Sequence, residues 1–133
     1  MVYMYFPTVG NRISSSGSRR LSHIYSKLGI EFQVRRISAE TLPYELFLTW
    51  CQHIDDLDEI INSGKKLNEF LEYEGVELDE LSLRGLYYAI LKHPHILRDP
   101  ICWNGKMVTA GIKQDDALRM MPRKHRIAAL QPN

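Results

Sequence analysis

Cysteine and long apolar runs are scarce in this chain of 133 residues. Only Cys51 and Cys102 occur, and their spacing matches neither a zinc site nor a disulfide framework, so we expect two buried thiols and no metal. No apolar run approaches the roughly 20 residues that a membrane helix needs. Residues 1–6 also lack the basic segment that begins a signal peptide. These absences predict a soluble, cytoplasmic protein without membrane contact.

The composition is that of an ordinary globular protein. Hydrophobic residues make up 44% of the chain and charged residues 25%, which argues against a disordered or fibrous chain. The length suits one compact unit. We therefore expect residues 1–133 to form a single α/β domain.

Charge is unevenly distributed although the net charge is only +1. Residues 1–36 and 81–133 are basic, whereas residues 37–80 hold twelve carboxylates against two lysines. Such asymmetry suits a protein that has an acidic face for one partner and a basic face for another. The alternative is that the acidic block only solvates helices, and the sequence leaves both interpretations open.

A strand, a helix and a second strand are predicted at the start of the chain. Residues 2–6 form an apolar run that ends at Pro7, and residues 7–17 hold turn formers. From Ser18 the apolar positions follow helical spacing up to Gly29, with Ser18 or a serine just before it as the N-cap. Residues 30–37 alternate again, so the two strands should pair in parallel through a right-handed crossover.

The remainder predicts a helical insertion and then a hairpin. Residues 43–93 contain no convincing strand, and apolar spacing indicates helices near residues 46–51, 57–61, 67–73 and 82–93. Strands at 100–103 and 106–110 flank Asn104-Gly105, a strong hairpin signal, and a last helix covers 114–121. This order predicts a thioredoxin-like fold, a four-stranded mixed sheet with a helical insertion at about 43–93.

Several strings across nearly the whole chain resemble the Spx branch of the arsenate reductase (ArsC-like) family. They are LRGLY at 83–87, HP at 93–94, ILRDPI at 96–101 and MPRKHR at 121–126. The strand at 2–5 and the segment DEII at 58–61 fit the same family. The resemblance implies a cytoplasmic stress-response regulator that binds the C-terminal domain of the RNA polymerase α subunit. It would reach promoter DNA through the polymerase complex and would need no cofactor, no small-molecule substrate and no catalysis.

The redox motif of that family is missing here. The resemblance places its CxxC pair between the first strand and the first helix, at Ser15 and Ser18 of this chain. A hydroxyl neither forms a disulfide nor has a thiol-like pKa to depress. We therefore expect these CxxC-equivalent positions to be redox-inactive. The serines can cap the helix or, beside two arginines, bind an anion, and both interpretations stay open.

The family's anion site is also altered. Its arginine directly before the third strand's proline is Asp99 here, with Arg98 one position earlier and Pro100 after it, where the resemblance implies a cis peptide bond. A carboxylate repels an oxyanion, so nucleophile and anion clamp are lost together. The resemblance thus predicts that this chain is not an enzyme.

The resemblance also marks two partner-facing segments. Asp56 stands where Spx regulators have a glycine that matters for the polymerase contact, so the partner-binding candidates are Asp55, Asp56 and Leu57. In the basic tail, the DNA-proximal candidates are Arg123, Lys124 and Arg126. A tail that is merely solvated is the alternative.

Two rival functions remain. The first is an arsenate reductase or another thiol oxidoreductase, which requires an accessible cysteine of low pKa. The second is a binding module with a different partner, such as a competitor of a true Spx relative. A binding measurement with the polymerase α C-terminal domain discriminates between these hypotheses.

Overall fold

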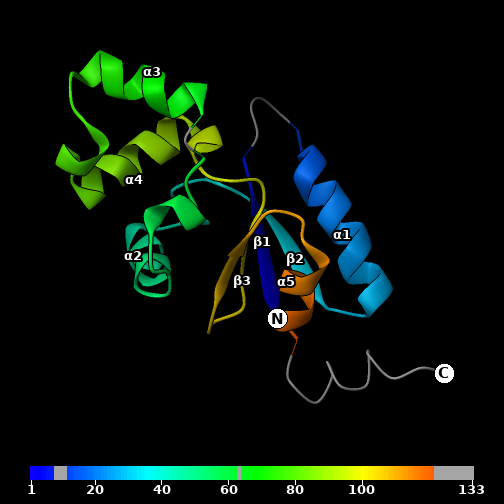
Figure 1. Cartoon of the computed structure of the whole chain (residues 1–133). Coiled ribbons are helices and arrows are strands. Elements are labelled where there is room, and N and C mark those ends of the chain that lie inside the picture. Colours follow the sequence, from blue (N-terminus) through cyan, green and yellow to red (C-terminus); the bar gives the residue numbers. More distant parts are fainter. Residues whose placement is uncertain (8–11, 63, 122–133) are drawn as a thin grey trace.

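A four-stranded mixed sheet forms the centre of the molecule (Figure 1). The computed structural model describes residues 1–7, 12–62 and 64–121. The strands follow the order β2-β1-β3-β4 and are β1 (Val2–Phe6), β2 (Phe32–Arg36), β3 (Ile101–Trp103) and β4 (Val108–Ala110). β1 pairs with β2 in parallel, and the other two pairs are antiparallel. The predicted fold class and strand pairing are confirmed.

The central strand β1 is buried on both of its faces. Successive side chains of a strand point to opposite faces, and Val2 and Met4 accordingly join one hydrophobic cluster while Tyr5 joins the other. Met4 and Tyr5 are completely buried. The apolar run of β1 therefore holds together two separate layers of helices.

The helices α1 (Ser16–Leu28) and α5 (Gln114–Arg119) cover one face of the sheet (Figure 1). Leu21 and Tyr25 of α1 pack with Met4 and Cys102. Gly29 ends α1 in the left-handed conformation, with φ 71°, which glycine adopts without steric cost. Because the Ile30 N–H still donates to the Tyr25 carbonyl, β2 begins two residues later than predicted.

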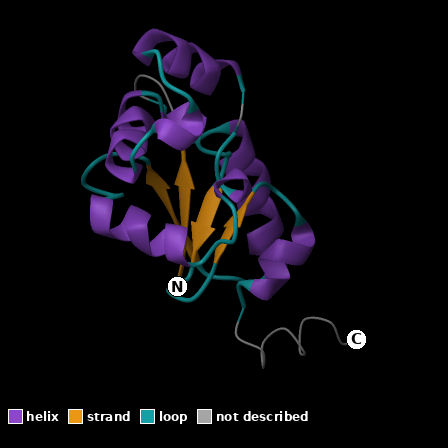
Figure 2. Cartoon of the chain, turned by 60° about the vertical axis from the view of Figure 1, so that its left-hand side comes forward, coloured by secondary structure: helices purple, strands orange, loops and turns teal. Residues whose placement is uncertain are grey.

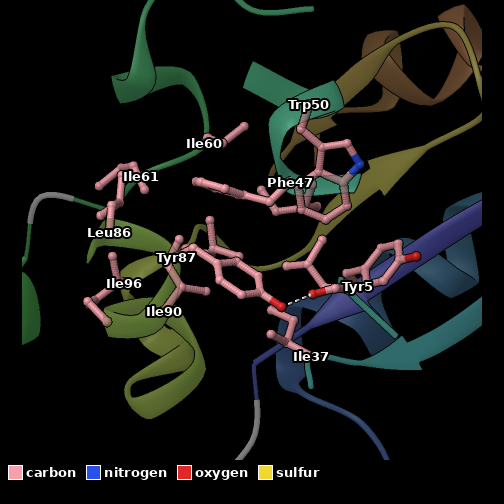
Figure 3. Close-up of a cluster of buried hydrophobic side chains, with 14 of the residues drawn as sticks. Tyr5, Ile37, Phe47, Trp50, Ile60, Ile61, Leu86, Tyr87, Ile90 and Ile96 are labelled. Atoms are coloured by element: carbon pink, nitrogen blue, oxygen red, sulfur yellow. Dashed lines mark hydrogen bonds between the residues drawn. The ribbon is translucent and has the colours of Figure 1, made fainter. Parts of the chain in front are cut away.

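The opposite face is covered by the helical insertion (Figure 2). It contains α2 (Tyr44–Gln52), α3 (Lys65–Glu74) and α4 (Leu83–Lys92). The ring of Trp50 packs edge-on against Tyr5 of β1, at 5.0 Å between centroids, and Phe47 lies beside it (Figure 3). The insertion also contains two short 3-10 turns, η1 (Leu57–Glu59) and η2 (Leu78–Glu80). A third turn, η3 (Pro94–Ile96), follows α4.

Two predicted elements are shorter in the structure. The helix expected at 57–61 is wrong, because the chain makes only the turn η1 before Ile61 forms an isolated antiparallel bridge with Leu97. The hairpin strand expected from Lys106 begins at Val108, because the Asn104 side chain accepts hydrogen bonds from the N–H groups of Lys106 and Met107. Among the described residues, no helix is long and apolar enough to cross a membrane.

The buried hydroxyl of Tyr87 links α4 to the segment between β2 and α2, and a substitution of Tyr87 tests this contact. It donates a hydrogen bond of 2.7 Å to the carbonyl of the fully buried Leu42. Tyr87→Phe leaves that carbonyl without its donor, so we expect a loss of about 1–2 kcal/mol in the free energy of unfolding, measured by urea denaturation. The neighbouring Tyr88 is 55% exposed, so Tyr88→Phe should change stability little. Equal effects of the two variants would contradict this role.

Candidate functional site

The N-terminus of α1 carries Ser15 and Ser18, the two serines that the resemblance aligns with the family's CxxC pair. Ser15 is the N-cap, and its side chain accepts a hydrogen bond of 3.0 Å from the Ser18 N–H. The Ser18 side chain in turn accepts one of 2.8 Å from the Ser15 N–H. This reciprocal capping box satisfies two N–H groups. Both serines therefore have a structural task at the helix end.

The Asp99 side chain, in the segment before β3, lies against the N-terminus of α1. The Ser15 hydroxyl donates a hydrogen bond of 2.6 Å to the Asp99 carboxylate. The helix dipole and free N–H groups of an N-terminus attract an anion. Asp99 thus places a carboxylate of the chain itself at the end of α1, where an external oxyanion would otherwise approach.

Gly17 permits the close approach of Asp99. A Cβ atom added to Gly17 would lie 2.7 Å from the Asp99 backbone oxygen and 2.8 Å from its carboxylate. Such distances are too short for any side chain, and a backbone oxygen cannot rotate away. The Asp99–Pro100 peptide bond is cis, the geometry that the resemblance implied for this position. Sequence analysis missed the role of Gly17, whose only signal was a glycine among the capping serines.

Neither cysteine belongs to the N-terminus of α1. Cys51 is half-buried in α2 and packs on the insertion side of the sheet, whereas the fully buried Cys102 lies in β3 and packs beneath α1. Burial raises the pKa of the Cys51 thiol and raises the pKa of the Cys102 thiol to about 12. Among the residues that the structure describes, neither thiol lies at a helix N-terminus, and no cation contributes to the shift of either pKa, although such neighbours are what activates a catalytic cysteine.

The partner-binding candidates form the turn η1. Asp56 is its N-cap and accepts a hydrogen bond of 2.9 Å from the Asp58 N–H. Glu59 accepts hydrogen bonds from the N–H groups of Asp55 and Asp56. Asp55 and Asp56 are exposed and Leu57 is half-buried. The signal for this capping box in the sequence is the Asp-x-x-Glu spacing of Asp56 and Glu59.

Arg98 joins η1 to the segment that carries Asp99. Its Nε donates a hydrogen bond of 2.9 Å to the Asp58 carbonyl, and its backbone N–H donates to the Ile60 carbonyl. One short segment before β3 thus contacts η1 through Arg98 and the end of α1 through Asp99. The structure brings three of the four predicted groups of site residues into one connected network. The fourth group, Arg123, Lys124 and Arg126, lies outside the described residues.

The contact between Gly17 and Asp99 can be tested by stability. Gly17→Ala gains about 1 kcal/mol of helix propensity but forces a methyl group onto the Asp99 backbone, which costs about 1–3 kcal/mol in a packed site. We expect a lower unfolding midpoint in thermal denaturation. Ser16→Ala is the control, because Ser16 lies one residue earlier and is exposed. A Gly17→Ala protein as stable as the Ser16→Ala protein would contradict the close approach.

No family model matches the chain. It is 38% identical over 77 residues to proteins described as "Global transcriptional regulator Spx" from Staphylococcus aureus and Staphylococcus epidermidis. The match covers 58% of this chain and 56% of each relative, so it spans little more than half the length of the curated relatives.

Solved structures show the same fold over most of the chain. The arsenate reductase from Vibrio cholerae superposes with a TM-score of 0.65 at 22% identity and covers 90% of this chain and 97% of its own. An arsenate reductase (ArsC) related protein from Brucella melitensis gives a TM-score of 0.54 at 16% identity, covering 84% and 87%. The chain is therefore similar in sequence to Spx regulators over little more than half of its length, and it shares the thioredoxin-like fold of these reductase-related structures.

Proposed function

We propose that this protein is a non-redox, non-catalytic transcription regulator that binds the C-terminal domain of the RNA polymerase α subunit in the cytoplasm. The similarity to proteins described as global transcriptional regulators supports the regulatory class. The observation that carries the proposal is the Ser15–Asp99 hydrogen bond. It fills with a hydroxyl and a carboxylate the helix end where the family resemblance expects a reactive thiol and an arginine.

The network around Asp99 supports a single, fixed state. Asp99 ties the segment before β3 to α1, and Arg98 ties the same segment to η1. A disulfide formed at the end of α1 could alter η1 through these contacts in a protein that has the two cysteines. Serines at both positions remove that reaction. The surface of η1 then keeps one arrangement in reducing and oxidising conditions.

The exposed carboxylates of η1 form the proposed contact surface. Asp55, Asp56, Asp58 and Glu59 are all exposed at this turn. Charges at an interface raise the association rate and the specificity for one partner more than they raise the affinity. The backbone of Asp56 is extended, with φ −140°, so the position does not need a glycine for conformational reasons. Any effect of a glycine here on binding therefore reports the side chain.

Asp56→Gly tests this surface directly. An N-cap Asp replaced by Gly loses only a few tenths of a kcal/mol of stability. If the carboxylate is poorly paired in the complex, we expect Asp56→Gly to strengthen binding to the isolated α C-terminal domain by on the order of 1 to 3 kcal/mol, measured by calorimetry. Weaker binding with a smaller salt dependence would show that Asp56 pairs with a basic residue of the partner, and would also support an interface here.

Asp79→Gly is the control for the loss of an exposed carboxylate elsewhere on the insertion. Asp79 is an exposed acidic residue in η2, a second 3-10 turn with the same Leu-Asp-Glu sequence as η1. It should leave the affinity unchanged. Unchanged affinity for Asp56→Gly as well, or no binding by either form, would remove η1 from the interface and favour a binding module with a different partner.

The second candidate function is a thiol oxidoreductase or arsenate reductase, which the solved reductases with this fold bring into consideration. It needs a thiolate near neutral pH. Burial raises the pKa of Cys102 to about 12 and that of Cys51 above its usual value, so both thiols should be protonated at pH 7 and below.

Alkylation kinetics check this prediction. We expect slow reaction of both cysteines with iodoacetamide in the folded protein at pH 7, and rapid reaction of two thiols after denaturation. Peroxide or diamide should produce no intramolecular disulfide, because the two cysteines pack on opposite faces of the sheet and a bridge requires Cα atoms within about 7 Å. One fast-reacting thiol in the folded protein, or a mass loss of two hydrogens, would favour the enzyme.

A further inference from the structure

The strand β2 forms one edge of the sheet. It stands at the end of the order β2-β1-β3-β4, so β1 is its only neighbour among the described strands (Figure 1). The Glu31 carbonyl accepts a hydrogen bond from the Val2 N–H, and the Ile37 N–H donates to the Phe6 carbonyl. Alternate residues of a strand direct their main-chain groups to opposite edges. The odd-numbered residues from 31 to 37 therefore face β1, and the even-numbered residues face away from the sheet.

Two residues of β2 offer their main-chain groups to another strand. Phe32 and Val34 each direct one N–H and one C=O away from β1. At Arg36 the outward carbonyl already accepts a hydrogen bond from the Thr41 hydroxyl, which lies in the turn after β2. The open part of the edge therefore spans Phe32 to Val34, and such an edge is a template for pairing with another chain.

The charges beside this edge have opposite signs but cannot meet within one chain. Glu31, directly before β2, and Arg35 point to the same face of the sheet, and four residues of strand span about 13 Å. Arg35 is held in place by a stacking contact, because its guanidinium lies 4.0 Å from the centroid of the Tyr3 ring. The ion pairs found among the described residues include neither Glu31 nor Arg35.

The other face of the same edge is apolar. Phe32 and Val34 are half-buried and pack against the hydrophobic cluster beneath α1. The ring of Phe32 lies edge-on to Tyr25 of α1, at 5.6 Å between centroids. Val34 lines a groove of about 280 Å³ beside α1. This helix therefore leaves part of the apolar edge uncovered.

We propose that two copies of this protein associate by antiparallel pairing of their β2 strands, with Phe32 of each copy opposite Val34 of the other. Residues whose groups both point outward must face each other in such a ladder. This register uses the outward groups of Phe32 and Val34 in both copies and leaves the occupied Arg36 carbonyl aside. The pair has twofold symmetry about Gln33, the commonest symmetry of protein dimers.

Charge complementarity favours a second copy as the occupant of this edge. The register places Glu31 of each copy directly opposite Arg35 of the other, so two ion pairs form, and opposite charges at such positions stabilise a sheet. On the other face, Phe32 contacts Val34 of the second copy. The neighbouring register, with Val34 opposite Val34, needs the occupied Arg36 carbonyl and forms neither ion pair.

Analytical ultracentrifugation of charge-reversed variants tests this pairing. Because the paired strands are short, we expect a weak dimer of the unmodified protein, with a Kd on the order of 100 µM. Glu31→Arg and Arg35→Glu each bring like charges together, so each should weaken association on the order of 10-fold. An equimolar mixture of the two variants restores both ion pairs in a mixed dimer and should associate about as strongly as the unmodified protein. Glu40→Arg, at an exposed glutamate outside β2, is the control and should not change association.

Hydrogen exchange of the unmodified protein gives a second test that needs no variant. The N–H groups of Gln33 and Arg35 face β1 and should be protected at every protein concentration. Those of Phe32 and Val34 should exchange rapidly in dilute protein and become protected as the concentration rises through the Kd.

Three results would overturn the proposal. They are a monomer at concentrations well above this Kd, a mixture of Glu31→Arg and Arg35→Glu that associates no better than either variant alone, and no concentration-dependent protection at Phe32 and Val34. Unfolding midpoints verify that the variants are folded. If Arg35→Glu does not fold, the exchange experiment decides alone. The pairing does not depend on the proposed function, because no polymerase domain takes part in these measurements.

Discussion

A hydrogen bond between the Ser15 hydroxyl and the Asp99 carboxylate joins the N-terminus of α1 to the segment that leads into β3. It is possible only because Gly17 offers no side chain at the point where Asp99 passes. The same bond gives the helix N-terminus a negative partner from within the chain. The N-terminus of α1 therefore contacts a carboxylate of the chain itself, at the place where an external anion could otherwise bind.

The segment that contains Asp99 also contacts η1, which belongs to the insertion on the opposite side of the sheet. Arg98, the neighbour of Asp99, donates to the Asp58 carbonyl and so fixes η1. Ile61 and Leu97 form an antiparallel bridge in the same region. The turn that carries Asp55 and Asp56 is thus held by the segment that also closes α1. In the proposed function, this network would keep the surface of η1 in one arrangement.

Local patterns predicted most of the fold. The apolar run of residues 2–6, the helical spacing after Ser18 and the turn Asn104-Gly105 each correspond to an element of the observed sheet or its helices. The errors arose where tertiary contacts override local preference. Apolar spacing suggested a helix at 57–61, but Ile61 pairs with Leu97, a residue 36 positions away, and this pairing stops the helix after one turn.

The candidate site was predictable in its residues but not in its connections. Ser15, Asp56, Arg98 and Asp99 were each singled out, since each departs from or flanks a family motif. Their contacts join residues 40 to 84 positions apart, and no periodicity in a single sequence reports such pairs. The role of Gly17 depends on a backbone oxygen that approaches from another part of the chain, and composition cannot reveal this.

The central proposal is that this protein binds the polymerase α C-terminal domain and that oxidation does not change the affinity. The most direct measurement is calorimetric titration of the isolated polymerase α C-terminal domain with two samples of this protein, one reduced and one treated with peroxide. The account predicts binding with the same affinity in both samples. A several-fold difference between the samples, or no binding by the reduced protein, would contradict it.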